Sequence, residues 1–319
     1  MQENTKCLQK NYFMKKILVI KHGALGDLIQ TTGIFRSISE HHKNDVVVLL
    51  VDKKFKFFIE NAPYFNHIIY DERPSFIRLD LWIKVIRKLV KESFDIVYDL
   101  QNSDRTSIYN FFININNNCL WSGNRKGGRL RYNPNDFEQI PVLKRLYNQL
   151  KIINLEVNLN PDLSWMDRDI SEFIPINKYI ILIPGSSKNL KHKRWPANNF
   201  GELALRLQTK GYDIAIIGTN DERNEIEKIK SYSSKFHDFS NNDLSFVAAL
   251  CRSASGVVAN DTGPTFIAGA VNCPVTWLLS HHTNPDLVRP QCKKLKIIKK
   301  QDISDILVSD VENNLALRS

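Results

Sequence analysis

The sequence predicts an α/β protein with two Rossmann-like domains whose parallel sheets face a central cleft. Apolar runs of strand length alternate with stretches of helical spacing along the chain, and glycine turns follow several of the expected strands. The chain has 319 residues, which is too long for one typical core and suits two domains of roughly 150 residues. Because open α/β sheets bind ligands at the carboxyl ends of their strands, we expect the functional residues there.

Composition indicates which class of protein this is and which partners it favours. With 43% hydrophobic and 24% charged residues the chain is of ordinary globular type, and its formal charge of +10 favours an anionic partner. No apolar run reaches the roughly 18 residues of a membrane-spanning helix, and residues 1–13 lack the apolar core of a signal peptide. We therefore expect a cytoplasmic protein with peripheral membrane contact at most.

The five cysteines favour the same compartment. Their number is odd and their spacing wide, which predicts neither a disulfide framework nor a zinc site and fits reducing surroundings. They are Cys7, Cys119, Cys251, Cys273 and Cys292.

The first strand and the glycine turn after it organise the N-terminal half. Residues 1–13 are an expected disordered tail before the apolar strand 17–20, and KHGALGDLIQTTG at 21–33 then opens a helix. Gly23 and Gly26 are expected to allow positive φ and close approach to the backbone. The turn matches neither the dinucleotide fingerprint nor a Walker A loop, so the residues alone leave the ligand open.

Asp27 stands at the entrance to that helix and allows two interpretations. As an N-cap it would accept hydrogen bonds from the free amides of the first turn. As a general base at the floor of a cleft it would accept a proton from a substrate hydroxyl.

The rest of the first half continues the alternation, with strands expected at 46–51, 67–70 and 95–100 and helices at 79–91 and 142–153. The helix at 79–91 carries basic residues off its apolar face, which form a solvated surface or contact anionic headgroups or glycan phosphates. The polar residues 101–105 after a strand form an ordinary loop or line an acceptor pocket.

A glycine-rich basic stretch, GNRKGGRLRYN at 123–133, is expected to be a mobile loop. It is either solvated or grips an anionic acceptor, for which arginine forks are suited. Its candidate acceptor-binding residues are Arg125, Lys126, Arg129 and Arg131.

The second half repeats the pattern after an expected linker at 161–171. That linker contains Asp167 and Asp169 in a D-x-D, from which we expect no metal site because no strand precedes it to fix the geometry. Strands are expected at 179–183, 214–217, 256–259 and 275–279, with the last closing the sheet, and helical spacing at 303–317 predicts a final helix.

Three segments together resemble the heptosyltransferases of glycosyltransferase family 9, inverting enzymes of the GT-B fold that build the lipopolysaccharide inner core. They are KILVIKHGALGDLIQTTG at 16–33, PGSSKNLKHKRWP at 184–196 and NDTGPTFIAGAVNCP at 260–274. The resemblance implies an acceptor-binding domain at 14–165 and a nucleotide-sugar domain at 166–300. It also implies that residues 301–319 form a helix that packs back toward the N-terminal domain.

The resemblance also implies roles for single residues. Asp27 matches the base that deprotonates the acceptor hydroxyl, and Lys193 matches the cation that offsets charge on the donor diphosphate. Glu222 matches the carboxylate that holds ribose, and Asp261 the acid that faces the donor sugar. The other implied donor-binding residues are Gly26, Ser186, Ser187, Thr262 and Gly263.

One position departs from the family pattern. A histidine usual three residues after the Thr-Gly pair is replaced by Phe266, which puts the identity of the donor or full activity in question. His281 and His282 are candidates to compensate.

These observations predict an enzyme that transfers heptose from ADP-heptose to a lipopolysaccharide core or related glycan, with no metal and no tightly bound cofactor. Its expected partners are the nucleotide sugar, an anionic glycolipid or glycan and, peripherally, the cytoplasmic face of the inner membrane. Nucleic acid is not expected, because the basic residues are not interleaved with aromatics in a recognised motif. The alternatives are a different nucleotide sugar, a sugar-nucleotide 2-epimerase, or a non-catalytic sugar-nucleotide-binding protein.

Overall fold

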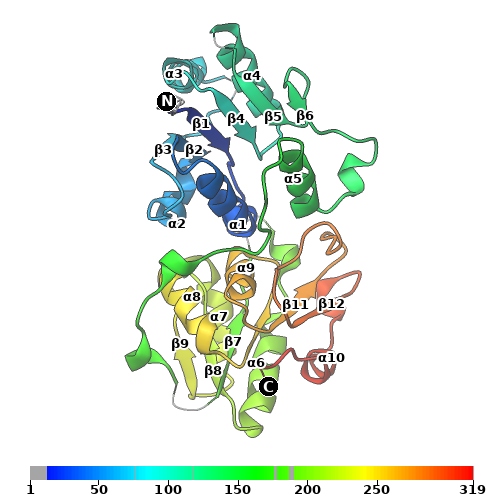
Figure 1. Cartoon of the computed structure of the whole chain (residues 1–319). Coiled ribbons are helices and arrows are strands. Elements are labelled where there is room, and N and C mark those ends of the chain that lie inside the picture. The colour runs from blue at the N-terminus through cyan, green and yellow to red at the C-terminus, as the bar shows by residue number, and fades with distance from the viewer. Residues whose placement is uncertain (1–12, 76, 117, 176–177, 187–189, 319) are drawn as a thin grey trace, which may run out of the picture.

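A computed structural model describes residues 13–75, 77–116, 118–175, 178–186 and 190–318. Each half of the chain forms a six-stranded parallel sheet with helices, and Figure 1 shows the halves one above the other. The predicted α/β class with two Rossmann-like halves is confirmed. The disorder expected of residues 1–12 and the phosphate contact expected of Ser187 lie outside the described residues.

The first sheet has the strand order β3-β2-β1-β4-β5-β6. Along β1, alternate side chains enter different hydrophobic clusters, Ile17 and Val19 on one face and Leu18 and Ile20 on the other. The sheet is therefore buried on both faces, as parallel sheets usually are. Its strands are β1 Lys16–Ile20, β2 Val46–Asp52, β3 His67–Asp71, β4 Ile96–Asp99, β5 Leu120–Gly123 and β6 Leu130–Arg131. Its helices are α1 Leu25–His41, α2 Lys56–Ile59, α3 Leu79–Lys91, α4 Asp104–Asn116 and α5 Val142–Lys151.

The second sheet has the order β12-β11-β10-β7-β8-β9, which is the same winding as the first. In each sheet the strand order reverses once, between β1 and β4 and between β7 and β10, and such switch points open a ligand crevice. The strands are β7 Tyr179–Ile183, β8 Asp213–Ile216, β9 Phe236–Asp238, β10 Gly256–Ala259, β11 Val275–Leu279 and β12 Leu295–Lys299. The helices are α6 Ala197–Thr209, α7 Arg223–Lys230, α8 Leu244–Ser253, α9 Gly263–Ala270 and α10 Val308–Asn313.

The structure has four strands that the sequence argument did not predict, β5, β6, β9 and β12, and two of them correct specific expectations. The basic stretch 123–133 is not simply a loop, because β6 pairs in parallel with β5 and places Leu130 opposite Ser122. The strand β11 does not close its sheet, since β12 pairs along its outer edge. Both strands were missed because β6 has only two residues and β12 is largely exposed, so neither shows the buried apolar pattern.

The final helix also differs from the expectation. Instead of returning to the N-terminal domain, α10 packs against α6 of the second half, where Glu312 pairs with Arg206 at 3.0 Å (Figure 1). Ile306 and Val311 enter the hydrophobic cluster beside α6. The apolar residues at 303–317 therefore complete the second core.

The two halves meet where the start of α1 packs on α9 (Figure 1). A Cβ atom on Gly26 would lie 2.7 Å from Cδ2 of Phe266, so the ring and the helix are in close contact. One hydrophobic cluster runs from α1 through α9 into the second half. A backbone hydrogen bond of 3.0 Å from Val142 to Leu287 adds a second tie.

Candidate active site

A cavity of about 690 Å³ opens at the switch point of the first sheet. Lys21, directly after β1, and Leu100 to Asn102, directly after β4, form part of its lining. The position is where an open α/β sheet binds its ligand. Of the two interpretations of residues 101–105, an ordinary loop or the lining of a pocket, the structure shows pocket lining for Gln101, Asn102 and Asp104.

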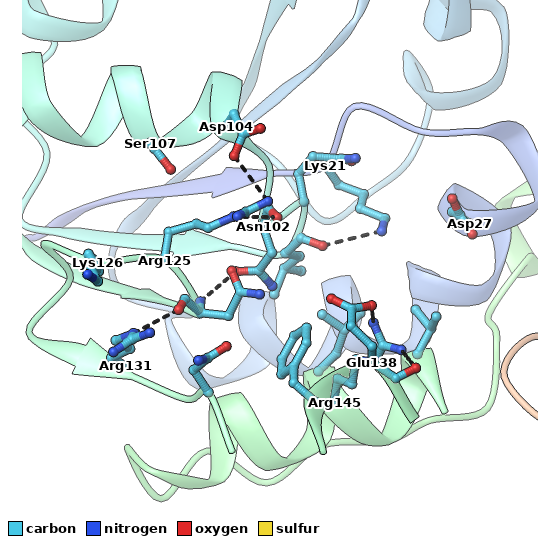
Figure 2. Close-up of a pocket in the computed structure, with 17 residues that line it drawn as sticks. Lys21, Asp27, Asn102, Asp104, Ser107, Arg125, Lys126, Arg131, Glu138 and Arg145 are labelled. Carbon is cyan, nitrogen blue, oxygen red and sulfur yellow. Dashed lines mark hydrogen bonds and ion pairs between the residues drawn. The ribbon is translucent and has the colours of Figure 1, made fainter. Parts of the chain in front are cut away.

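Asp27 and Lys21 stand together at one end of this cavity (Figure 2). Asp27 is the third residue of α1, and its Oδ2 accepts a hydrogen bond of 3.1 Å from the amide of Ala24. It is therefore not the N-cap, a position held by Ala24. The Asp27 carboxylate lines the cavity while still binding the start of its helix.

Lys21 is a site residue that the sequence argument missed. It is buried, and its Nζ donates to the carbonyl oxygen of Leu100 at 3.3 Å. Burial lowers the pKa of the Lys21 ammonium, while the carboxylates of Asp27 and Asp99 act in the opposite direction. A lysine just before a glycine turn does not by itself indicate a site residue. The burial of Lys21 depends on the loop after β4, which is distant in the sequence.

Three of the four basic residues predicted to bind an acceptor line the cavity at the end away from Asp27: Arg125, Lys126 and Arg131 (Figure 2). Arg125 pairs with Asp104 at 3.2 Å, and Nε of Arg131 donates to the Asn124 carbonyl at 2.8 Å. The fourth, Arg129, is not among the described lining residues and donates to Asn118 instead.

A network around Asn102 holds the basic loop over the cavity. The Asn102 side chain accepts from the Asn124 amide at 2.7 Å and donates to Gln149 at 3.0 Å. Asn102 itself has a φ of 54°, a left-handed conformation that asparagine tolerates better than most residues. Buried Asp99 accepts from the amides of Gln101 and Asn102, and burial raises its pKa. The loop expected to be mobile is thus tied to β4, β5 and α5.

The remaining charged lining comes from α5 and the turn before it. Arg145 pairs with Glu138 at 3.1 Å and stacks over the ring of Phe137 at 4.8 Å. Neither charged residue was predicted, since their spacing in the sequence carries no motif. They add an arginine and a carboxylate to the cavity.

A second cavity of about 440 Å³ opens at the switch point of the second sheet. One wall is apolar and is formed by Ile183, Ile217, Leu244 and Val247. The lining also has a polar part, its polar end, which includes Gly185, Ser186, Thr219, Glu222, Thr262 and Gly263. Four residues predicted to bind the donor therefore meet here, namely Ser186, Glu222, Thr262 and Gly263.

The carboxylate of Glu222 is held on both oxygens. Oε1 accepts from Arg194 at 3.0 Å, and Oε2 accepts from the amide and hydroxyl of Thr219 at 3.0 and 2.8 Å. A Cβ atom on Gly185 would lie 2.9 Å from Cδ of Glu222, so the glycine makes room for this arrangement. Glu222 forms a fixed wall of the cavity.

Arg194 is a second residue that the sequence argument missed. It is almost fully buried, pairs with Glu222 and Glu225, and donates through Nε to the Ser186 hydroxyl at 3.2 Å. Arg194 directly follows the predicted Lys193, and its type alone did not separate it from the surrounding basic residues. It orders the polar end of the cavity.

Lys193 and Asp261 form a cluster beside the start of α9. Nζ of Lys193 lies 2.7 Å from Oδ2 of Asp261, and Thr283 bonds to both groups, at 3.1 Å to Nζ and 2.7 Å to Oδ2. The ring of His282 lies 4.4 Å from that of His192, next to Lys193, while His281 binds the Gln301 carbonyl. The histidine pair named from the sequence thus places one ring beside this cluster.

The helix α9 begins with Thr262 as its N-cap and has its positive end at the second cavity. Phe266, one turn further, is buried and contacts Gly26 and the ring of Trp277, with ring centroids 6.1 Å apart. Positive φ is found at Gly23 but not at Gly26, which is helical. Gly26 therefore accommodates Phe266 and is not among the described lining residues of either cavity.

The first turn of α1 separates the two cavities. Leu25 lines the second cavity and Asp27 lines the first. Residues two apart on a helix point about 200° away from each other, which explains how one turn serves both. Asp27 therefore faces the first cavity from a helical turn whose other side, at Leu25, borders the second.

The described residues contain no group of three or more acidic, histidine or cysteine side chains able to hold a metal. Asp169 of the D-x-D accepts from the Ser171 amide at 2.9 Å, and Asp167 lies 3.7 Å from Arg252. Asp169 therefore takes part in a local turn, and Asp167 faces an arginine of α8.

Comparisons with known proteins, by sequence and by fold, find heptosyltransferases and another member of glycosyltransferase family 9. Lipopolysaccharide heptosyltransferase 2 of Escherichia coli strain K12 is 22% identical over 307 residues, covering 89% of this chain and 88% of that protein. The fold matches the glycosyltransferase family 9 protein of Veillonella parvula with a TM-score of 0.76 at 17% identity, covering 94% of this chain and 95% of that one. It also matches E. coli heptosyltransferase WaaC with ADP, with a TM-score of 0.73 at 15% identity, covering 93% and 98%.

The family model described as glycosyltransferase family 9 (heptosyltransferase) matches residues 82–306, which include the Lys193–Asp261 cluster and the start of α9. The protein is a glycosyltransferase of the GT-B fold, and it belongs to glycosyltransferase family 9, the heptosyltransferase family.

Proposed function

We propose that this glycosyltransferase moves heptose from ADP-heptose to a lipopolysaccharide core sugar or related glycan, with inversion at the anomeric carbon and Asp27 as general base. The observation that carries the proposal is the position of Asp27 on the helical turn between the two cavities. We further propose that the reaction takes place at the cytoplasmic face of the inner membrane.

The second cavity is the proposed donor site. Its apolar wall suits a nucleobase, and its polar end suits ribose and diphosphate. Thr262 and Gly263 at the start of α9 line this cavity, and we assign their amides and the ammonium of Lys193, which pairs with nearby Asp261, to the diphosphate. One structural relative, E. coli heptosyltransferase WaaC, has a structure with ADP, which supports an adenine nucleotide here.

Phe266 replaces the histidine usual in the family, but other nitrogen-bearing side chains remain on the donor side. Phe266 takes part in the contact between α1 and α9, while Lys193 and the His192–His282 pair supply nitrogen donors nearby. We therefore propose ADP-heptose as the donor even though Phe266 replaces that histidine.

The first cavity is the proposed acceptor site. Lys21, Arg125, Lys126, Arg131 and Arg145 give it a cationic lining that suits carboxylates and phosphates on a core oligosaccharide. Arginine forks can bind such groups through two hydrogen bonds at once.

The chemistry follows from these positions. The acceptor hydroxyl gives its proton to the Asp27 carboxylate while its oxygen attacks the anomeric carbon of the donor. The bond between that carbon and the diphosphate oxygen breaks, and the leaving nucleoside diphosphate keeps the electron pair. Lys193 and the α9 amides stabilise the charge that develops on it. One displacement inverts the anomeric configuration.

The test is a transfer assay with the purified chain, a heptose-free core oligosaccharide, and ADP-heptose compared with other ADP-, UDP- and GDP-sugars. We expect a mass increase of one heptose only with ADP-heptose, and an NMR coupling pattern that shows inversion. Transfer from another nucleotide sugar would overturn the donor assignment, and conversion of a sugar nucleotide without acceptor would identify an epimerase. Binding without either reaction would favour a non-catalytic role.

A further inference from the structure

The helices α3 and α4 form the end of the first half that lies farthest from the second half (Figure 1). They pack side by side, with the ring centroids of Trp82 and Tyr109 5.7 Å apart. The guanidinium of Arg105 lies 4.2 Å from the ring centroid of Trp82. These buried contacts fix which faces of the two helices turn outward.

Large apolar side chains stay exposed on these outward faces. In α3 the side chains are Leu79 and Ile83, 65% and 46% exposed, and in α4 they include Phe111 and Ile115, 63% and 60% exposed. Phe112, 38% exposed, lies edge-on to Phe111 with ring centroids 5.3 Å apart. We call these five residues the α3–α4 patch.

Helical spacing shows that the patch is contiguous. Leu79 and Ile83 are four residues apart and share one stripe of α3, and Ile108, Phe112 and Ile115 share one stripe of α4. Arg105, which contacts Trp82 of α3, belongs to the same side of α4 as Ile108 and Phe112. The apolar stripe of Ile108, Phe112 and Ile115 therefore lies on the side of α4 that meets α3. Clusters of exposed apolar side chains on soluble domains mark interaction sites.

The charge on the α3 side of the patch is strongly positive. Between Arg78 and Lys91 the only acidic residue is Asp80, which pairs with Arg78. Four further cations on α3 are exposed, namely Lys84, Arg87, Lys88 and Lys91. An apolar surface with aromatic rings and a cationic rim has the chemistry of a site that inserts into anionic lipid headgroups.

We propose that the α3–α4 patch docks this enzyme on an anionic lipid bilayer, with Phe111, Phe112 and Ile115 in the boundary of the acyl chains. The described residues contain no helix of the length and apolar character needed to cross a bilayer. Attachment through this part of the chain would thus be at the surface. The cationic rim favours lipid headgroups over an uncharged protein surface as the occupant.

Helix α4 connects the patch to the first cavity. Asp104, Ser107 and Phe111 lie on one stripe of α4, and the first two line the cavity. Phe111 is about 10 Å along the helix from Asp104 at 1.5 Å per residue. If the acceptor is the glycolipid of the proposed function, its lipid would lie at the patch and its sugars would reach the cavity.

The test measures binding of the full chain to vesicles of phosphatidylcholine with or without phosphatidylglycerol, by co-sedimentation. We expect binding to the anionic vesicles, and Phe111→Ser with Ile115→Ser to reduce the partition coefficient by about tenfold or more. Arg87→Gln with Lys91→Gln should reduce it by roughly tenfold and weaken its dependence on salt. A matched control, Ile152→Ser with Leu307→Ser, removes apolar side chains that are 46% and 60% exposed elsewhere and should leave binding unchanged.

Three outcomes would overturn the proposal. Equal loss in the patch variant and the control would mean that no particular surface binds lipid, and absence of binding by the unmodified chain would remove the docking function. Self-association in solution that the patch variant abolishes would assign the surface to a second copy of the chain.

A transfer assay with a water-soluble, deacylated acceptor separates this proposal from the proposed function. The patch variant should retain full transfer there and lose rate only with acceptor in vesicles. A chain that binds anionic vesicles through the patch but transfers no heptose would contradict the proposed function while supporting the docking surface.

Discussion

The two cavities occupy equivalent places in two sheets of the same winding, yet they differ in chemistry. The cavity of the first half is lined by many charged side chains, including five cations, which come from strand ends, loops and α5. That of the second half has an apolar wall and a polar end, formed mainly by the turns after β7, β8 and β10. The difference shows that topology sets the location of a site and side chains set its ligand.

The supporting contacts of the two cavities both join distant segments. In the second half, Arg194 joins Ser186, eight residues away, to Glu222, 28 residues away. In the first half, Asn102 joins Asn124, 22 residues away, and Gln149, 47 residues away. The sequence signal differs, because Ser186 and Glu222 follow strands in recognisable turns, whereas Asn124 and Gln149 carry no motif. Variants that affect only one cavity can test whether the first binds the acceptor and the second binds the donor.

The largest effect is expected from Asp27→Asn, which keeps the shape of the side chain and removes the base. Loss of general base catalysis should reduce kcat by about 10²- to 10⁴-fold. Donor affinity, measured by thermal shift with ADP-heptose, should change little, because Asp27 lines the first cavity only. Full transfer by this variant would show that another group takes the proton.

The next effect is expected from Lys193→Ala on the donor side. The variant removes a charged hydrogen bond and leaves Asp261 without its ammonium partner, so kcat/KM for the donor should fall about 10- to 150-fold. The KM for the acceptor should stay nearly constant. Lys300→Ala, which removes a surface lysine 3.9 Å from Asp310 in the same half, is the matched control and should cost less than twofold. An equal loss in both variants would contradict a specific role for Lys193.

The sequence predicts most of the architecture because the central strands are buried on both faces. Apolar runs such as Ile17–Ile20 and Tyr179–Ile183 have the composition that a doubly covered parallel sheet requires. The edge strands β6 and β12 lack that composition, since their pairing depends on a neighbour already in place. The final helix was misplaced because its position was taken from the family resemblance, and apolar spacing indicates that a helix is covered without identifying the surface that covers it.

The same reasoning applies to the site. Ser186, Glu222, Thr262 and Gly263 follow strands in recognisable turns, and the structure brings them into one cavity. Lys21, Arg145 and Arg194 were missed because their roles come from tertiary contacts: with the β4 loop, with Glu138 and with Glu222. Arg129 has the same residue type and spacing as its neighbours but a different direction, which only the pairing of β6 determines.

Arg125 and Arg131 line the first cavity and Arg129 is not among its lining residues, so the three arginines provide a matched test. Arg125→Gln with Arg131→Gln removes two lining cations, which should raise the KM for an anionic core acceptor by about 10- to 100-fold. The kcat and the donor KM should change by less than about threefold, because the donor cavity is untouched. Arg129→Gln should be close to unmodified enzyme in all three constants. A KM effect of Arg129→Gln equal to that of the double variant would assign the effect to overall charge rather than to the lining of the cavity.

The smallest loss of catalytic efficiency is expected from Gly26→Ala, which tests whether α1 and α9 hold the two cavities in register. The added methyl would lie 2.7 Å from Cδ2 of Phe266, so the ring or the helix must shift. This strain outweighs the better helix propensity of alanine, and the free energy of unfolding should fall by about 1–2 kcal/mol. Urea denaturation measures it, and kcat should fall only a few-fold because Asp27 moves slightly against the donor cavity. Adding Phe266→Leu should recover part of both losses in a double-mutant cycle, since the smaller side chain makes room for the methyl group. Additive effects of the two substitutions would instead mean that this contact does not couple the halves.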